Sequence, residues 1–224
     1  AALVGVLGTL SLRASARPPT DEPWLGTIRA GLRYLTLHRP LAVVTTSGTL
    51  NALGGGALPI AGVALALERT GSATDGAFIV TAFALGGLLG GVLAAARPTT
   101  RFTPQFVMGA TAAAIGVFTL AAIPDVGIAW TIAAIGVSGL FTASGNAAML
   151  LLRKQQSPIG VRSQVFTIGS GLRATSGAAG AAIAGVVAGL PAGLLVAGIG
   201  IVWLLSAALM LAYPRGAEPL VDAA

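Results

Sequence analysis

The stretch LAVVTTSGTLNALGGGALPIAGVALAL, from Leu41 to Leu67, decides the fold class of this chain. It contains no charged residue and exceeds the ~20 residues that an α-helix needs to cross the hydrocarbon core of a bilayer. A strand of a membrane β-barrel needs only ~10 residues, in which apolar and polar side chains alternate. This stretch is more than twice as long and does not alternate, so we predict a transmembrane helix.

The composition of the whole chain also indicates a lipid environment. Of its 224 residues, 55% are hydrophobic and 9% are charged, against roughly 25% charged in an average soluble domain. A soluble monomer is excluded, because so apolar a chain cannot present a polar shell to water. The 32 glycines fit close packing between transmembrane helices. Cysteine is absent, which excludes disulfides, thiolate catalysis and cysteine metal sites.

Five further spans are predicted after the first. Three charge-free stretches of sufficient length are Gly76 to Ala96, Phe102 to Pro124, and Val126 to Leu152. The segment from Ser163 to Tyr213 carries one charge, Arg173, and Gly189-Leu190-Pro191 divides it, because Gly and Pro end helices. We therefore predict an all-α integral membrane protein with a bundle of six transmembrane helices over residues 40–214.

The remaining segments flank this bundle. Residues 1–12 are apolar but too short to cross, and we interpret them as the truncated end of a preceding transmembrane helix. Residues 13–39 form a basic linker, in which Thr20 or Asp21 is expected to cap a helix that begins near Pro23. One arc of that helix carries its apolar residues: Trp24, Leu25, Ile28, Leu32 and Leu35. We expect this amphipathic helix to lie in the membrane interface; the alternative is that it packs under the bundle. Residues 215–224 form a tail.

The basic residues fall on one side of the predicted spans. Eleven occupy one set of connections and ends: Arg13, Arg17, Arg29, Arg33, Arg39, Arg97, Arg101, Arg153, Lys154, Arg162 and Arg215. The opposite connections contain only Arg69. The positive-inside rule therefore predicts a multi-pass protein of the plasma membrane with both ends of the six-helix unit in the cytoplasm. This distribution explains the net charge of +6 without binding to nucleic acid.

Arg173 is the main candidate functional residue. It lies ten residues beyond Ser163, or ~15 Å along a helix, which places it near the middle of the ~30 Å hydrocarbon core. Its neighbours on the same helical face are small: Gly169, Ser170, Ser176, Gly177 and Gly180. A charge at this depth is costly unless it faces protein or water. We expect Arg173 either to bind an anionic group of a substrate or to pair with a carboxylate during transport; the alternative is a purely structural role between helices.

Asn51, Asn146 and Ser170 complete the predicted substrate pathway. Asn51 lies ~15 Å into the first span, and Asn146 follows Ser144 and Gly145 in the fourth. For both amides the alternative is a hydrogen bond between helices that only stabilises the bundle. No catalytic residue, cofactor or metal site is predicted, and His38 is interpreted as an ordinary residue at the membrane edge.

Two groups of glycines are expected to shape the helices. Gly54, Gly55 and Gly56, together with Pro59, are predicted to weaken or kink the first span. Gly86 with Gly90, and Gly87 with Gly91, form two registers of the Gly-x-x-x-Gly pattern, which allows close helix packing.

The overall pattern resembles the C-terminal half of a major facilitator superfamily transporter. Six spans with both ends inside follow a basic linker and the end of an earlier span. Before the fifth span, Pro158, Arg162 and Val165 match the Pro-x-x-x-Arg-Gly-Arg-Val pattern of the drug and siderophore exporter branch, while Ser163 and Gln164 depart from it. The Gly86 to Gly91 run, followed by Arg97 and Arg101, resembles half of a second motif of the superfamily, without its acidic residue.

The resemblance implies one half of a twelve-helix secondary active transporter. Its partners would be the lipid bilayer, a small-molecule substrate and an N-terminal six-helix half, and the two halves would provide alternating access, with efflux driven by an ion gradient. The alternative is a polytopic scaffold or channel-type subunit without transport activity of its own. A membrane enzyme is disfavoured, because the chain has one histidine, no cysteine and no acidic pair within a span.

Overall fold

A computed structural model describes residues 24–96, 101–214 and 216 of the chain. The described part contains helices joined by turns and short loops, and no strand: α2 (Trp24–Leu37), α3 (Arg39–Thr70), α4 (Ala73–Ala96), α5 (Pro104–Leu120), α6 (Ile128–Gly139), α7 (Thr142–Gln155), α8 (Ile159–Val186) and α9 (Ala192–Met210). The predicted helix cap at Thr20 or Asp21 and the predicted truncated span over residues 1–12 lie outside the described residues.

Four helical segments are long and apolar enough to cross a membrane. They are α3, α4, the combined segment Ile128–Gln155 formed by α6 and α7, and α9. Helix α5 is apolar but has 17 residues, and α8 has 28 residues with Arg173 at its middle. The secondary structure of the described residues is therefore all-helical, as expected of an all-α membrane protein.

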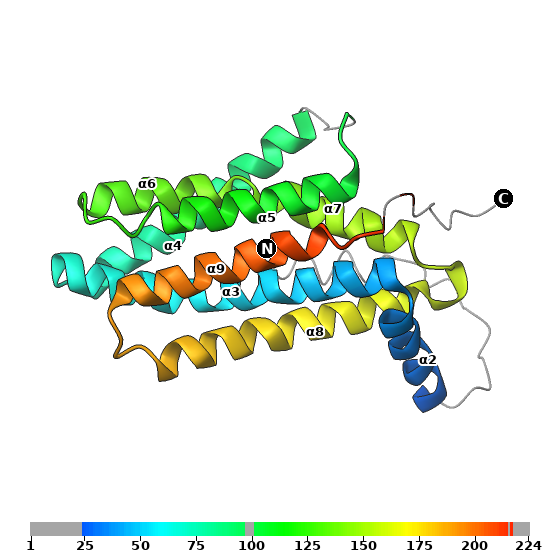
Figure 1. Cartoon of the computed structure of the whole chain (residues 1–224). Coiled ribbons are helices and arrows are strands. Elements are labelled where there is room, and N and C mark those ends of the chain that lie inside the picture. Colours follow the sequence, from blue (N-terminus) through cyan, green and yellow to red (C-terminus); the bar gives the residue numbers. More distant parts are fainter. Residues whose placement is uncertain (1–23, 97–100, 215, 217–224) are drawn as a thin grey trace, which may run out of the picture.

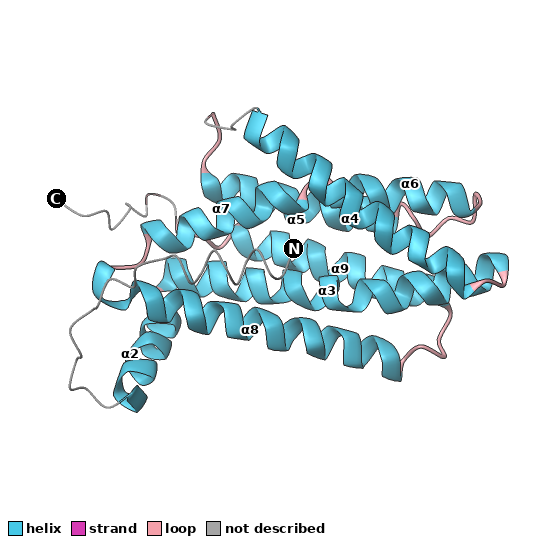
Figure 2. Cartoon of the chain, turned by 180° about the vertical axis from the view of Figure 1, so that it is seen from behind, coloured by secondary structure: helices cyan, strands magenta, loops and turns pink. Residues whose placement is uncertain are grey.

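The long helices lie side by side, with α3 near the centre of the bundle (Figure 1). Helix α3 packs against α8, α9 and α4, while α5 packs against α9 and α7, and α4 against α6. Helices α7 and α8 barely touch each other. The view from behind shows α8 along one edge of the bundle, with α4 and α6 at the opposite edge (Figure 2).

Helices lie at all six predicted spans, but only four of these spans are long and apolar enough to cross a membrane, so the predicted count of six is not confirmed. The chain reverses between Val187 and Pro191, where Gly189-Leu190-Pro191 predicted the break. The fourth predicted span, in contrast, is two helices, because the helix ends at Gly139 and a new one begins at Thr142. Helix α7 also continues beyond Leu152 to Gln155, so Arg153 belongs to the helix and not to the following connection.

The glycine and proline cluster of α3 does not interrupt the helix. Helix α3 is continuous from Arg39 to Thr70 with Pro59 inside it. A Cβ on Gly56 would overlap the carbonyl oxygen of Gly177, and a Cβ on Gly180 would overlap that of Leu53. The glycines therefore let the backbones of α3 and α8 touch, which is the use of small residues in membrane helices.

The Gly-x-x-x-Gly pattern of α4 also forms a close helix contact. A Cβ on Gly86 would overlap the carbonyl oxygen of Gly136, and a Cβ on Gly90 would overlap that of Leu140. Gly87 and Gly91 face side chains of α7 with more room. Of the two predicted registers, Gly86 with Gly90 is the one that joins backbones.

Helix α2 crosses the end of the bundle where α3 and α8 begin (Figure 1). Its Leu35 is buried with Leu41 and Val165, and the hydroxyl of Tyr34 donates a 3.2 Å hydrogen bond to the backbone oxygen of Gln156. Leu32, predicted on the same apolar arc as Leu35, is 47% exposed. The last turns of α2 thus pack on the bundle, which agrees in part with the alternative interpretation of this helix.

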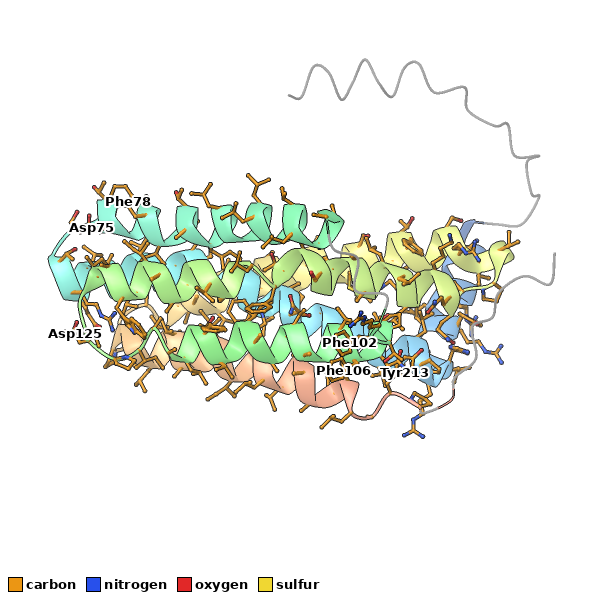
Figure 3. All side chains as sticks on the ribbon, turned by 90° about the horizontal axis from the view of Figure 1, so that it is seen from above. Asp75, Phe78, Phe102, Phe106, Asp125 and Tyr213 are labelled. Carbon is orange, nitrogen blue, oxygen red and sulfur yellow. The ribbon has the colours of Figure 1, made fainter. Side chains whose placement is uncertain are left out.

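The acidic residues of the described part gather at the other end. Asp75 and Asp125 lie there, opposite to Phe102 and Tyr213 (Figure 3). The guanidinium of Arg69 lies 3.6 Å from Asp125 and also donates to Thr131, while Glu68 accepts a 2.9 Å hydrogen bond from the backbone of Ala192. These contacts tie α3 to the ends of α5, α6 and α9.

Candidate functional site

A small polar cavity lies inside the apolar bundle. It is lined by residues of five helices, α3, α5, α7, α8 and α9, and its volume is about 20 Å³. That volume admits about one water molecule. Its polar lining residues are Ser47, Asn51, Thr111, Thr142, Asn146, Arg173 and Ser206.

Arg173 provides the charge of this cavity. It lies midway along α8, and its Nη2 atom donates a 3.0 Å hydrogen bond to Oδ1 of Asn146 on α7. Its Nε atom is buried and has no hydrogen-bond partner within the described residues. The bond to Asn146 therefore joins two helices that otherwise barely touch, and it leaves part of the guanidinium unsatisfied.

Helix α3 is held beside the cavity by hydrogen bonds to its backbone. The hydroxyl of Ser176 donates to the carbonyl of Thr49 at 2.7 Å, and the indole of Trp203 donates to the carbonyl of Asn51 at 3.0 Å. Ser47 and Ser206 bond each other at 2.9 Å on the buried side. These bonds fix the wall that carries the Asn51 side chain, which lines the cavity.

Arg153 is the residue that the sequence analysis missed. It was assigned to a cytoplasmic connection, yet its side chain is only 1% exposed. Its Cζ and Nη1 atoms lie 2.8 Å from the position that a Cβ would take on Gly169, so the guanidinium occupies the space which that glycine leaves open. Its Nε and Nη2 atoms have no hydrogen-bond partner in the described part of the chain.

The two arginines meet at Gly48. A Cβ on this glycine would lie 3.7 Å from Nη2 of Arg153 and 3.9 Å from Cδ of Arg173. Gly169 and Arg173 are one turn apart on α8, so both guanidinium groups lie along the same face of that helix. Arg153 does not itself line the cavity, but its charge lies close to Arg173 at Gly48, so the two positive charges repel each other.

The sequence did contain a signal for Arg153. Residues 146, 149 and 153 follow the i, i+3, i+7 spacing, which places Arg153 on the same face of α7 as Asn146. The neighbouring Lys154 is exposed and does belong to the surface. Adjacent basic residues therefore have opposite environments, which a count of charges by loop cannot detect.

The predicted pathway residues are only partly brought together. Arg173, Asn51 and Asn146 line one cavity, but Ser170 is exposed and does not line it. The loop-motif residues lie at the start of α8, away from the cavity. Pro158 precedes the first turn, Nε of Arg162 donates to the carbonyl of Ser157 at 3.2 Å, and Val165 is fully buried.

No described carboxylate is available to neutralise the two arginines. Within residues 24–96, 101–214 and 216, the acidic residues are Glu68, Asp75 and Asp125. Glu68 and Asp125 are engaged at the far ends of α3 and α5, and Asp75 is in the first turn of α4. The cavity therefore has a net positive charge.

Comparisons with known proteins do not identify a family. No protein-family model, no curated protein and no solved structure matches this chain. The resemblance to the major facilitator superfamily rests on the sequence pattern alone.

Proposed function

We propose that this chain is one half of a secondary active transporter and that the cavity around Arg173 belongs to its substrate pathway. The observation that carries the proposal is the Arg173–Asn146 pair, a charged and a polar side chain that line a cavity in the middle of a membrane bundle. Charged residues in such positions are costly and characteristically mark ion or substrate pathways.

The surroundings of the pair favour a role in transport over a fixed structural link. A structural arginine would be saturated by carbonyls and hydroxyls, as Arg69 is by Thr131, Ile123 and Pro124 at the far end of the bundle. Arg173 instead makes one hydrogen bond, and Asn146 is exposed. The pair is thus accessible from the side on which α7 and α8 diverge.

In this proposal the bundle comprises six spans: α3, α4, α5, the α6–α7 segment, α8 and α9. The proposal draws on the resemblance of the sequence to the C-terminal half of the major facilitator superfamily, in which Pro158, Arg162 and Val165 fit the loop motif and Ser163 and Gln164 depart from it. A second six-helix half would cover the α7–α8 side and complete the cavity near the midplane. The substrate is a small molecule, which the transporter exports across the plasma membrane by alternating access, and an ion gradient supplies the energy. The basic end of the bundle lies in the cytoplasm.

The close backbone contacts give this half the rigidity that rocking requires. Helices α3 and α8 touch through Gly56 and Gly180, and α4 touches α6 through Gly86 and Gly90. Packed elements of this kind move as bodies rather than deform continuously. We expect the bundle to move against its partner half as one unit.

Transport by the full-length protein tests the proposal. Energised inverted membrane vesicles would be tested with a cationic probe, ethidium, and an anionic probe, carboxyfluorescein. We expect Arg173→Leu to abolish the uptake of any probe that the parent protein moves, and Lys154→Gln, at an exposed site, to preserve it. Transport by correctly inserted Arg173→Leu protein at the parental rate would contradict the proposed role.

A further inference from the structure

We infer that Arg153 and Arg173 form a two-guanidinium binding site for an oxyanion, such as a carboxylate, phosphate or sulfate group. This inference names the ligand class of the cavity and therefore rests on the proposed function. Arg153 does not line the cavity, but its buried guanidinium lies against the Gly48 wall of the cavity, and two of its nitrogens have no hydrogen-bond partner in the described residues.

Arg153 is buried without a partner for its charge within the described part of the chain. The side chain is 1% exposed, and two of its three nitrogens are buried without a hydrogen-bond partner in the described residues. Arginine remains charged in proteins and carries five N–H donors in a planar fork. A buried charge is normally paired or bonded, so this guanidinium lacks a partner that the folded protein should supply or bind.

The two arginines lie close to each other. Both approach Gly48, and Arg153 lies over Gly169, one turn from Arg173. Like charges this close repel, and an anion between them would turn that repulsion into two attractions. Guanidinium forks bind carboxylate and phosphate oxygens in a bidentate manner, which a single chloride ion does not reproduce.

An anion would reach the site from the side on which Asn146 is exposed. The cavity admits one water, so a larger ligand must approach from the exposed side of Asn146. Arg173, which is half-buried, would contact the ligand first, and Arg153 would hold its inner side. Met149 lines the cavity beside Gly48, and its unbranched side chain can rotate to make room.

The oxyanion has two possible sources with the same chemistry. One is an anionic group of a free ligand, which in the transporter would be the substrate. The other is a carboxylate of the protein itself, from outside the described residues, where this chain has Asp21, Glu22, Glu218 and Asp222.

The purified 224-residue chain in detergent would be unfolded by heat in increasing sulfate, phosphate or acetate, with chloride as the reference at equal ionic strength. We expect at least one oxyanion to raise the unfolding midpoint beyond the effect of chloride. Arg153→Gln should weaken that response by about 10- to 100-fold in apparent dissociation constant, while Lys154→Gln, one residue away on the surface, should leave it unchanged. If Arg153→Gln does not fold, Arg173→Gln is measured in the same way.

A chain in which Asp21, Glu22, Glu218 and Asp222 are all neutralised distinguishes the sources. A response confined to this variant would assign the site to an internal carboxylate, and a response in the parent chain would assign it to a free ligand. The inference is wrong if oxyanions raise the unfolding midpoint of both chains no more than chloride does. It is also wrong if they raise the midpoint of the arginine variants as much as that of the parent chain. Transport by a protein that binds no oxyanion would contradict the oxyanion site and leave the proposed transport function intact. Oxyanion binding by a full-length protein that transports nothing would contradict the transport function and leave the oxyanion site intact.

Discussion

Nη2 of Arg173 and Oδ1 of Asn146 lie 3.0 Å apart, and this hydrogen bond bridges α8 and α7 at the open side of the polar cavity. The donor is a charged group at the middle of a long helix, and the acceptor is a neutral amide. A neutral acceptor holds the arginine in place without cancelling its charge. The pair therefore keeps the positive charge available to a ligand or to a partner helix.

Replacing the amide by a carboxylate should satisfy that charge. We expect Asn146→Asp to form a charge-assisted pair with Arg173 and to raise the unfolding midpoint of the chain, because the carboxylate would satisfy the positive charge of the guanidinium. Thermal unfolding in detergent would measure the change. Asn146→Leu, which removes the acceptor, should destabilise the chain instead. A carboxylate at residue 146 with no stabilising effect would contradict the described geometry.

The close contact between α3 and α8 makes a prediction with an internal control. Gly56→Ala should lower the free energy of unfolding by about 1–3 kcal/mol, because its methyl group would overlap the backbone of Gly177. Gly55→Ala should be tolerated, because no atom lies within 4 Å of that Cβ position. The midpoints of thermal unfolding in detergent would be compared. Equal effects of the two neighbouring substitutions would show that α3 and α8 do not pack as described.

The pH dependence of stability should depend on His38. Burial lowers the pKa of His38 below its usual value of 6.5, and Nδ1 has no hydrogen-bond partner in the described residues. The unfolded chain therefore binds the proton more readily than the folded chain. The contribution of His38 to stability is complete above pH ~6.5 and decreases as the pH falls towards the folded pKa.

Unfolding midpoints of the parent chain and of His38→Gln test this sign. His38 is the only histidine in the chain, so the variant should show a flatter profile between about pH 7.5 and pH 5.5. If the parent chain became more stable on acidification over this range, the assigned direction would be wrong.

The orientation can be tested in this cysteine-free chain by introducing single cysteines. Thr74→Cys places a thiol at the start of α4, and Gly160→Cys places one at the start of α8, where a Cβ meets no atom within 4 Å. In intact cells an impermeant maleimide should label residue 74 of the full-length protein but not residue 160. Labelling of residue 160 alone would invert the predicted topology.

Much of the fold could be predicted from apolar length and helix breakers. Leu41 to Leu67 is the centre of α3, and Gly189-Leu190-Pro191 marks the turn before α9. The division between α6 and α7 was missed, because residues 138–141, Ser-Gly-Leu-Phe, contain neither a charge nor a proline. The α6–α7 division lies where Leu140 packs against Gly90 of α4. The hydropathy pattern of one segment contains no information about such a contact with another helix.

The candidate site was predictable in part for a similar reason. Arg173 and Asn51 stand out as polar residues in apolar runs, and they do line one cavity. Arg153 follows Leu152 directly and precedes Lys154, so the charge pattern favoured a surface loop, while its burial depends on the space over Gly169 of another helix. Ser170 has the right depth but lies on the exposed face of α8. Depth is encoded locally, whereas the direction of a side chain depends on neighbouring helices.

Alternating access to the cavity is the central claim, and cysteine accessibility tests it without knowledge of the substrate. Thr142 lines the cavity and Val92 is an exposed apolar residue of α4, so Thr142→Cys is the probe and Val92→Cys the lipid-facing control. In the full-length protein in sealed vesicles, we predict that an impermeant maleimide labels residue 142 from either side and that an imposed ion gradient shifts the ratio of the two rates. Residue 92 should remain unlabelled. Labelling of residue 142 from one side only, at a rate that no gradient changes, would contradict the account.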